Sequence, residues 1–150
     1  MMNVNVITTL KEKREEKRIA FERKVLRELS IKNLKEKVHF YFSPFFRSHS
    51  IFSTAIEDGS IDIAIEVYIL GAKMSKFGYF GETEDQVKVR CSSDIKYYSD
   101  SLYEYLQYWG AASGNDLINE SIHLAAEQFV SYWWKEGFRK GERRYKMRLH

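Results

Sequence analysis

The stretch from Asp58 to Gly81 constrains the fold more than any other part of the chain, because it is the most apolar segment. It shows no strand-like alternation of apolar and polar residues. Gly78 follows its last apolar residues, at a position where helices often end, since glycine adopts left-handed backbone geometry without steric cost. We therefore predict a central buried helix over about residues 60–77.

Capping and breaking residues divide the preceding part of the chain into further helices. Residues 9–29 are strongly charged, with opposite charges three or four positions apart that support a solvated helix. Ser30 can cap a second helix, which must end before Pro44 because proline disfavours helical geometry in the residue before it. Residues 45–57 give a mixed pattern and are assigned a short helix.

The second half of the chain continues this pattern of helix and break. Glu82–Asp85 places negative charge at the start of a helix, where the helix dipole favours it. Residues 94–109 carry Tyr, Leu and Trp at helical spacing. Asn115 or Asp116 can then cap a last long helix. The sequence contains no β-type alternation of any length.

Length and composition indicate one folded domain. The chain has 150 residues, a single proline and 15% aromatic residues, which is typical of a globular protein with a real core. We therefore predict an all-α fold in which residues 1–150 form one compact, multi-helix, bundle-like domain. Its ends, residues 1–8 and about 141–150, are expected to be frayed.

The cysteine content and the N-terminus indicate the cytoplasm. Cys91 is the only cysteine, so it cannot form an internal disulfide, which is compatible with a reducing compartment. The N-terminus carries charges in place of the long apolar core of a signal peptide. No run reaches the roughly 18–20 apolar residues needed to cross a bilayer. We expect a cytoplasmic protein with no membrane association.

A glycine inside the predicted central helix indicates close packing. Gly71 costs about 1 kcal/mol relative to alanine at such a position. Ala64 lies seven residues earlier on the same side of the helix. Two small residues on one side favour close approach by another helix or by an aromatic ring.

Two acids interrupt the same helix and define a candidate site. Asp62 and Glu66 lie one helical turn apart, and Lys73 follows on the same stripe. In a pocket, burial could raise the pKa of one carboxyl group and supply an acid or a base. A narrow polar strip that reaches water is the favoured interpretation, because structural pairing also perturbs carboxylates. The candidate polar stripe or pocket consists of Asp62, Glu66, Tyr68 and Lys73.

Two Glu-x-x-His pairs suggest a metal site. They are Glu36-Lys-Val-His39 and Glu120-Ser-Ile-His123. In four-helix bundles, two such pairs and two further glutamates hold a di-metal centre. At about 100° per residue, however, both pairs point away from the apolar faces of their helices. Solvated helix surface is therefore favoured, with a metal site at Glu36, His39, Glu120 and His123 as the weaker alternative, and no cofactor is expected.

Trp134 falls on the helical stripe of Glu120, His123 and Glu127, away from the predicted core face. A large aromatic side chain on a polar face is a candidate contact for a partner, since Trp is enriched in binding hot spots. Cover by the preceding helices would explain it equally well. The candidate partner surface consists of Trp134, His123 and Glu127.

The C-terminal segment from Phe138 to His150 is strongly basic. Such a tail can neutralise phosphates, and Tyr145 could stack on a base, so nucleic-acid binding is one interpretation. The other is a helix end whose positive charges suit the negative pole of the helix dipole. No nucleic-acid motif accompanies the segment. The candidate nucleic-acid contacts are Arg139, Lys140, Arg143, Arg144, Lys146 and Arg148.

Two segments resemble a known family. They are residues 61–82, which contain Tyr-Ile-Leu-Gly-Ala-Lys-Met-Ser-Lys-Phe-Gly-Tyr-Phe-Gly, and residues 126–138, which contain Val-Ser-Tyr-Trp-Trp-Lys-Glu-Gly-Phe. Both are similar to a short family of uncharacterised proteins from Bacillus-type bacteria, catalogued as a domain of unknown function. The resemblance covers most of the chain. It implies a soluble bacterial protein with a compact fold, carries no activity, and does not include the Glu-x-x-His pairs.

These observations favour a non-catalytic cytoplasmic binding or adaptor protein that acts through the aromatic and charged surface near the C-terminal helix. Two alternatives stay open. One is nucleic-acid binding by the basic tail, and the other is small-ligand binding or catalysis with Asp62 and Glu66. The expected partner is an unidentified protein, and a homodimer is a further option.

Overall fold

The computed structural model describes residues 2–46, 52–111 and 115–147. In these ranges every regular element is a helix and no strand is formed, so the predicted all-α fold is confirmed. The chain divides into two units, residues 1–30 and 31–150. None of the helices in the described ranges has the length and apolarity needed to span a bilayer.

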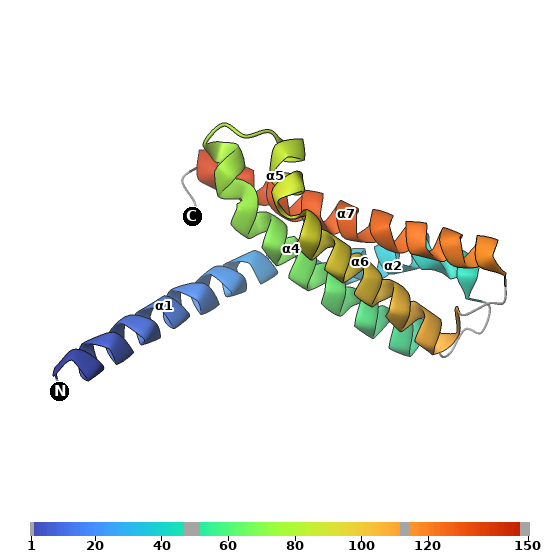
Figure 1. Ribbon diagram of the computed structural model, residues 1–150, viewed down its shortest axis with the longest axis horizontal. Coiled ribbons are helices and arrows are strands. Elements are labelled where there is room, and N and C mark those ends of the chain that lie inside the picture. Colours follow the sequence, from blue (N-terminus) through green and yellow to red (C-terminus); the bar gives the residue numbers. More distant parts are fainter. Residues whose placement is uncertain (1, 47–51, 112–114, 148–150) are drawn as a thin grey trace. The chain divides into compact units, whose positions relative to one another are not determined.

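The first unit is the charged helix α1 (Met2–Leu26), which is 25 residues long (Figure 1). It begins earlier than residue 9, so residues 2–8, for which fraying was predicted, are helical. Side chains 9–20 are all exposed. Arg18 pairs with Glu15 and with Glu22. Pairs three or four residues apart stabilise a helix by a few tenths of a kcal/mol each.

The second unit holds the other α-helices: α2 (Ile31–Phe42), α4 (Glu57–Tyr79), α5 (Glu84–Arg90), α6 (Ser92–Leu106) and α7 (Asp116–Lys146). Three short turns extend them: 3₁₀ helix at Ser43–Phe45, and π-helix at Phe52–Ile56 and Gln107–Ala111. Part of the short helix predicted over residues 45–57 lies outside the described residues. The α7 helix continues to Lys146, so residues 141–146 are helical, and Arg148 lies outside the described part of the chain.

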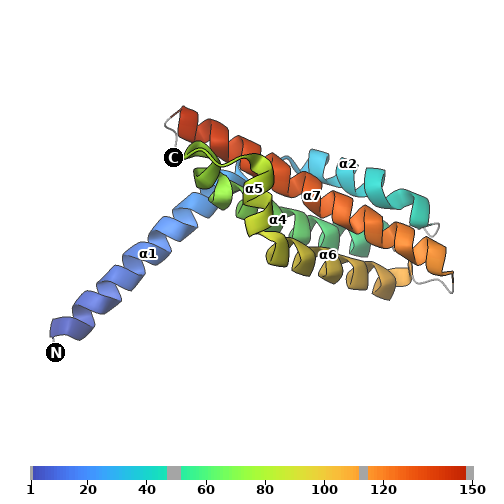
Figure 2. The same cartoon turned by 45° about the horizontal axis from the view of Figure 1, so that its top comes forward.

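The helices α4 and α7 form the centre of the second unit. They lie side by side, while α2 and α6 contact both of them from opposite sides (Figures 1 and 2). The predicted central helix is confirmed, with Ala64, Val67 and Tyr68 among its buried residues. The sequence did not indicate that α7 shares this central position.

Glycines allow α4 and α7 to approach at backbone distance. A Cβ atom on Gly71 would lie 2.2 Å from the carbonyl oxygen of Trp134, and a Cβ atom on Gly137 would lie 2.0 Å from the carbonyl oxygen of Tyr68. No side chain fits at either position. Further along, a Cβ atom on Gly141 would lie 2.3 Å from the Ser75 hydroxyl oxygen. The contacting positions thus advance together along both helices, so the two helices run parallel. The packing predicted from Gly71 is confirmed.

The end of α4 differs from the prediction. The helix continues to Tyr79, and the glycine with positive φ is Gly81, at 114°. Gly78 has a different role, because a Cβ atom there would lie 2.5 Å from the ring of Phe138. Gly78 therefore makes room for a side chain of α7.

Other boundaries follow the predicted caps and breaks. Asn115 caps α7, since its side-chain oxygen accepts a hydrogen bond of 2.9 Å from the Leu117 N–H. The α2 helix ends at Phe42, before Pro44. The α5 helix begins within the acidic segment 82–85 as predicted, but its cap, Thr83 in a capping box with Gln86, was not predicted. In each case a local hydrogen bond or a missing N–H fixes the boundary.

Trp134 is placed differently from the prediction, because it is fully buried. Its indole stacks on the ring of Phe138 at 5.1 Å and lies beside the thiol of Cys91, at the junction of α5 and α6. The neighbouring Trp133 is also buried and packs against Tyr68. The assignment of Trp134 to a partner surface is therefore wrong. The prediction assumed that α7 has a single apolar face, but other helices cover α7 on several sides.

Candidate functional site

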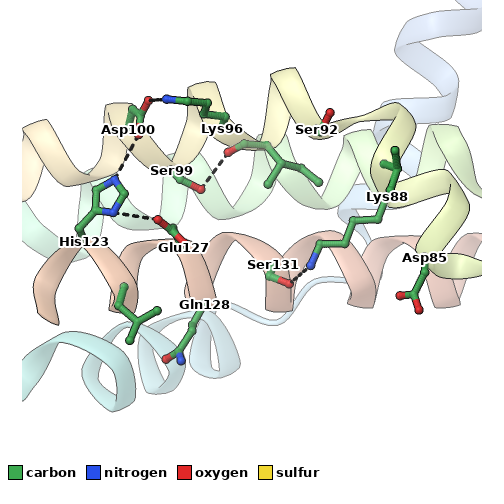
Figure 3. Close-up of a pocket in the computed structure, with 13 residues that line it drawn as sticks. Asp85, Lys88, Ser92, Lys96, Ser99, Asp100, His123, Glu127, Gln128 and Ser131 are labelled. Atoms are coloured by element: carbon green, nitrogen blue, oxygen red, sulfur yellow. Dashed lines mark hydrogen bonds and ion pairs between the residues drawn. The ribbon is translucent and has the colours of Figure 1, made fainter. Parts of the chain in front are cut away.

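A groove of about 770 Å³ runs along α7, with α5 and α6 on its other side (Figure 3). We call it the α6–α7 groove. Its apolar lining comes from Val89, Ile95 and Leu124. Val89 is 71% exposed and Leu124 is 54% exposed, so these side chains are available to a bound molecule.

A cluster of charged side chains around His123 lies at one end of the groove (Figure 3). The His123 Nε2 atom lies 3.2 Å from Asp100 Oδ1 on α6, and Nδ1 lies 2.8 Å from Glu127 Oε1 on α7. The Nζ atom of Lys96 lies 2.7 Å from Asp100 Oδ2. Hydrogen bonds from Lys96 and then His123 lower the pKa of Asp100. His123 thus connects α7 to α6 through Nε2, whereas its Nδ1 contact with Glu127 lies within α7.

A lysine crosses the groove beyond this cluster. Lys88 on α5 donates a hydrogen bond of 2.6 Å from Nζ to the Ser131 hydroxyl on α7 (Figure 3). Burial lowers the pKa of Lys88, and the nearby charge of Lys135 lowers it further, while Asp85 and Glu84 act in the opposite direction. No carboxylate among the described residues forms an ion pair with this ammonium group.

The groove includes two of the three residues predicted as a partner surface. His123 and Glu127 line it, whereas Trp134 lies in the core. Sequence reasoning missed the residues from α5 and α6. The spacing of Lys96 and Asp100 could have indicated an i,i+4 ion pair, but no spacing rule connects Lys88 with Ser131, which lie 43 positions apart.

The predicted polar stripe lies on α4, outside this groove. Asp62, Glu66 and Lys73 are exposed, as expected for a strip that reaches water. Tyr68 is not part of that strip, because it is only 2% exposed and packs against Trp133 of α7. The structure therefore does not bring these four residues together around a pocket.

The residues of the Glu-x-x-His pairs lie on two separate helices, α2 and α7. His39 Nε2 lies 3.1 Å from Glu57 Oε1 on α4, and His123 binds the two carboxylates described above. Glu36 and Glu120 are exposed. In the part of the chain that the structure describes, no group of three or more His, Cys, Asp or Glu side chains could hold a metal ion.

Several residues of the basic tail are engaged within the chain. Arg139 binds Glu84 of α5 through two hydrogen bonds, of 2.8 and 3.2 Å. Arg144 is only 7% exposed, so its assignment as a nucleic-acid contact is wrong. The ring of Tyr145 stacks on Tyr79 at 5.4 Å and is therefore occupied. Lys146 lies 3.9 Å from its helix neighbour Glu142.

Lys140 and Arg143 are the remaining predicted nucleic-acid residues in the described part of the chain, and neither forms an ion pair with a described residue. Of these two, Arg143 is exposed. Affinity for nucleic acid grows with the number of phosphates that are neutralised. Within the described part of the tail, few cations are left for phosphates, so the described residues give nucleic-acid binding little support.

Comparison with known proteins places the chain in a family. A family model described as "Protein of unknown function (DUF2521)" matches residues 4–150. The chain is 27% identical over 134 residues to the "Uncharacterized protein YbaK" of Bacillus subtilis (strain 168), over 89% of this chain and 91% of that protein. No solved structure matches the chain. The resemblance seen in the sequence is confirmed, and the protein belongs to the DUF2521 family of proteins of unknown function.

Proposed function

We propose that the protein is a non-catalytic binding module of the cytoplasm, and that the α6–α7 groove binds a segment of a partner protein. The observation that carries this proposal is the exposed apolar lining of the groove between two fixed polar clusters. Binding sites typically combine apolar contact area with a few polar groups that set orientation. Val89 and Leu124 supply the first, and the His123 cluster and Lys88 supply the second.

The form of the groove favours a chain segment as its occupant. The groove lies open along α7 from His123 to Ser131, with residues of α5 and α6 facing it throughout. Apolar grooves between helices commonly accept a peptide or an amphipathic helix that lies along them. A small ligand would also fit this volume.

The polar groups of the groove support binding rather than catalysis. Lys88 and Ser131 have the side chains of a Ser–Lys catalytic dyad. An acyl-transfer site also needs N–H donors directed at the oxyanion. Ser131 lies in the middle of α7, where backbone N–H groups donate to the preceding turn. The backbone around Ser131 therefore offers no oxyanion hole.

Site-specific photocrosslinking in the native cells tests the proposal. A photoreactive amino acid at position 124 should give a covalent adduct with one partner protein, which mass spectrometry identifies. Leu117 provides a matched control, because it is a 71% exposed leucine of the same helix outside the groove. The same amino acid at position 117 should give no such adduct.

Calorimetry with the purified partner then completes the test. The variant Leu124→Glu places a charge among the apolar side chains of the groove and should abolish binding, whereas Leu117→Glu should leave the affinity unchanged. Equal affinities of both variants and the unmodified protein would remove the groove as the binding site. Circular dichroism confirms that both variants are folded.

A further inference from the structure

Lys88 has hydrogen-bonding capacity that the protein itself does not use. An ammonium group has three N–H donors, and the described contacts of Lys88 Nζ consist of the bond to Ser131. Its side chain is half-buried and crosses from α5 to α7 at the groove (Figure 3). A charged group in such a place is costly unless an acceptor of opposite charge compensates it.

A second cation, Lys135, lies one helical turn beyond Ser131, the last residue of α7 that lines the groove. Its charge is near enough to lower the pKa of Lys88. No described residue forms an ion pair with Lys135. Two ammonium groups that repel each other reduce stability, and such arrangements are typical of sites that bind an anion.

The carboxylates around this pair are largely engaged elsewhere. Glu84 holds Arg139 through two hydrogen bonds, and Glu127 binds His123. Asp85 lies on the same helix as Lys88 and acts on it only at longer range. Neither lysine therefore forms an ion pair with a described carboxylate, although Asp85 and Glu84 are near enough to Lys88 to raise its pKa.

We propose that Lys88 and Lys135, together with the Ser131 hydroxyl, bind a carboxylate of the partner segment, so that the groove selects acidic peptides. This inference rests on the proposed function of the groove. The two ammonium groups and the hydroxyl are all donors toward a carboxylate, and hydrogen bonds between ionised groups are the strongest kind. The carboxylate replaces no existing ion pair.

The apolar lining adds a second requirement. Leu124 precedes Ser131 by seven residues, which corresponds to about 10 Å along a helix. An extended peptide covers this distance in about three residues, and a helical one in about seven. The preferred segment therefore carries Asp or Glu at one end and a large apolar side chain about 10 Å away.

Selection from a random peptide library displays this preference directly. The full-length protein is immobilised, bound peptides are enriched, and the best of them are synthesised for fluorescence-anisotropy titration. Enriched peptides should contain an acid and an apolar residue at the stated separation. Replacing the acid by its amide should weaken binding about tenfold or more, since hydrogen bonds between charged groups are worth that much.

Variants of the protein assign the contact. Lys88→Gln and Lys135→Gln should each weaken the acidic peptide severalfold and have little further effect on its amide form, as expected for groups in contact. Lys88→Arg should retain most of the affinity, because it keeps the charge. Lys140→Gln, on the same helix but nine residues from Ser131, should change nothing. Circular dichroism checks that every variant is folded.

The two ideas fail in different ways. If peptides bind and Leu124→Glu abolishes binding, but acids are not enriched and Lys88→Gln has no effect, the carboxylate site is wrong and the groove function survives. If no selected peptide depends on Leu124, the groove function fails as well. Stronger competition by inorganic phosphate than by acetate at equal ionic strength would assign the lysines to a phosphoryl group and overturn the carboxylate proposal.

Discussion

Gly71 and Gly137 each lie where the backbone of the facing helix occupies the space of a side chain. In an exposed helix, replacing Gly by Ala stabilises by about 1 kcal/mol. Here the added methyl group meets a carbonyl oxygen, so Gly71→Ala and Gly137→Ala should lower the free energy of unfolding by about 1–3 kcal/mol. Urea denaturation measures it, with the exposed Lys73→Ala as control. A gain in stability would mean that α4 and α7 are not in backbone contact.

Lys135 allows the electrostatics of the groove to be tested by pH. A lysine with a lowered pKa reduces stability while it is charged, so stability rises as pH increases through that lowered pKa toward 10.5, the ordinary value. Lys135→Gln removes one cause of the shift in Lys88. It should raise the free energy of unfolding at pH 7 by a few tenths of a kcal/mol.

The gain from Lys135→Gln should disappear at a pH above 10.5, where Lys88 is neutral in both proteins. Urea denaturation across this pH range is the measurement, and Lys140→Gln is the control that should show no gain. A constant difference at all pH values would point to helix propensity as the cause instead of charge repulsion.

At the scale of single residues, the sequence predicted a tertiary contact only where a residue is unfavourable in its own helix. Gly71 is unfavourable in any helix, so its presence indicated close packing, and the structure agrees. Trp134 shows the limit of this reasoning. A helical projection of α7 alone does not reveal that Cys91, at the junction of α5 and α6, lies against this side chain. Lys88 and Ser131 are joined only by the tertiary fold, and neither residue is unusual on its own helix.

The short helix α5 depends on its N-terminal cap to hold Lys88 in place. The Thr83 hydroxyl accepts a hydrogen bond of 3.1 Å from the Gln86 N–H, and the Gln86 side chain accepts one of 2.9 Å from the Thr83 N–H. Thr83→Ala should cost about 1 kcal/mol and speed hydrogen exchange of the α5 amides. Thr83→Ser keeps the cap and should behave like the unmodified protein. Equal exchange in both variants would show that tertiary contacts alone fix α5.

The charge of Asp100 contributes to the contact between α6 and α7 through its ion pair with His123. Its pKa is lowered by hydrogen bonds from Lys96 and His123. A carboxylate with a lowered pKa contributes stability at pH values above its ordinary value of 3.8, and this contribution is lost as pH falls through the lowered pKa. Asp100→Asn should therefore lower the Tm at neutral pH, and the two melting curves should converge in strong acid.

Asp62→Asn serves as the control for Asp100, since Asp62 is an exposed acid of α4 outside the His123 cluster. It should change the Tm little at any pH. A loss of stability in Asp100→Asn that persists in strong acid would mean that packing, and not charge, is responsible.

For whole helices, the sequence predicts a boundary well when the signal is chemical and local. As expected, α2 ends before Pro44, and Asn115 caps the beginning of α7. Gly78 misled because a glycine can end a helix or make room for a neighbour, and only the facing Phe138 distinguishes these roles. The groove could not be predicted from the sequence for the same reason, because its prediction requires knowing which helices are adjacent.

In the molecule as a whole, the α4–α7 contact and the groove belong to residues 31–150, although Val25 of α1 is also fully buried. The α4–α7 contact, the flanking helices α2 and α6, and all residues that line the groove lie in this unit. Helix α1 is a separate unit whose residues 9–20 are exposed and carry their own ion pairs. The α4–α7 contact and the groove therefore share one set of helices, and α1 contributes to neither of them.

Removal of residues 1–30 tests this division. The remaining chain should unfold in one cooperative transition and should bind the peptides selected by the groove with unchanged affinity. Thermal melts followed by circular dichroism and anisotropy titrations measure these properties. A peptide of residues 1–30 should be only partly helical alone, because isolated helices are marginal in water. A broad transition of residues 31–150 would show that α1 is needed for the core, whereas a sharp one with lost peptide affinity would place part of the binding surface on α1.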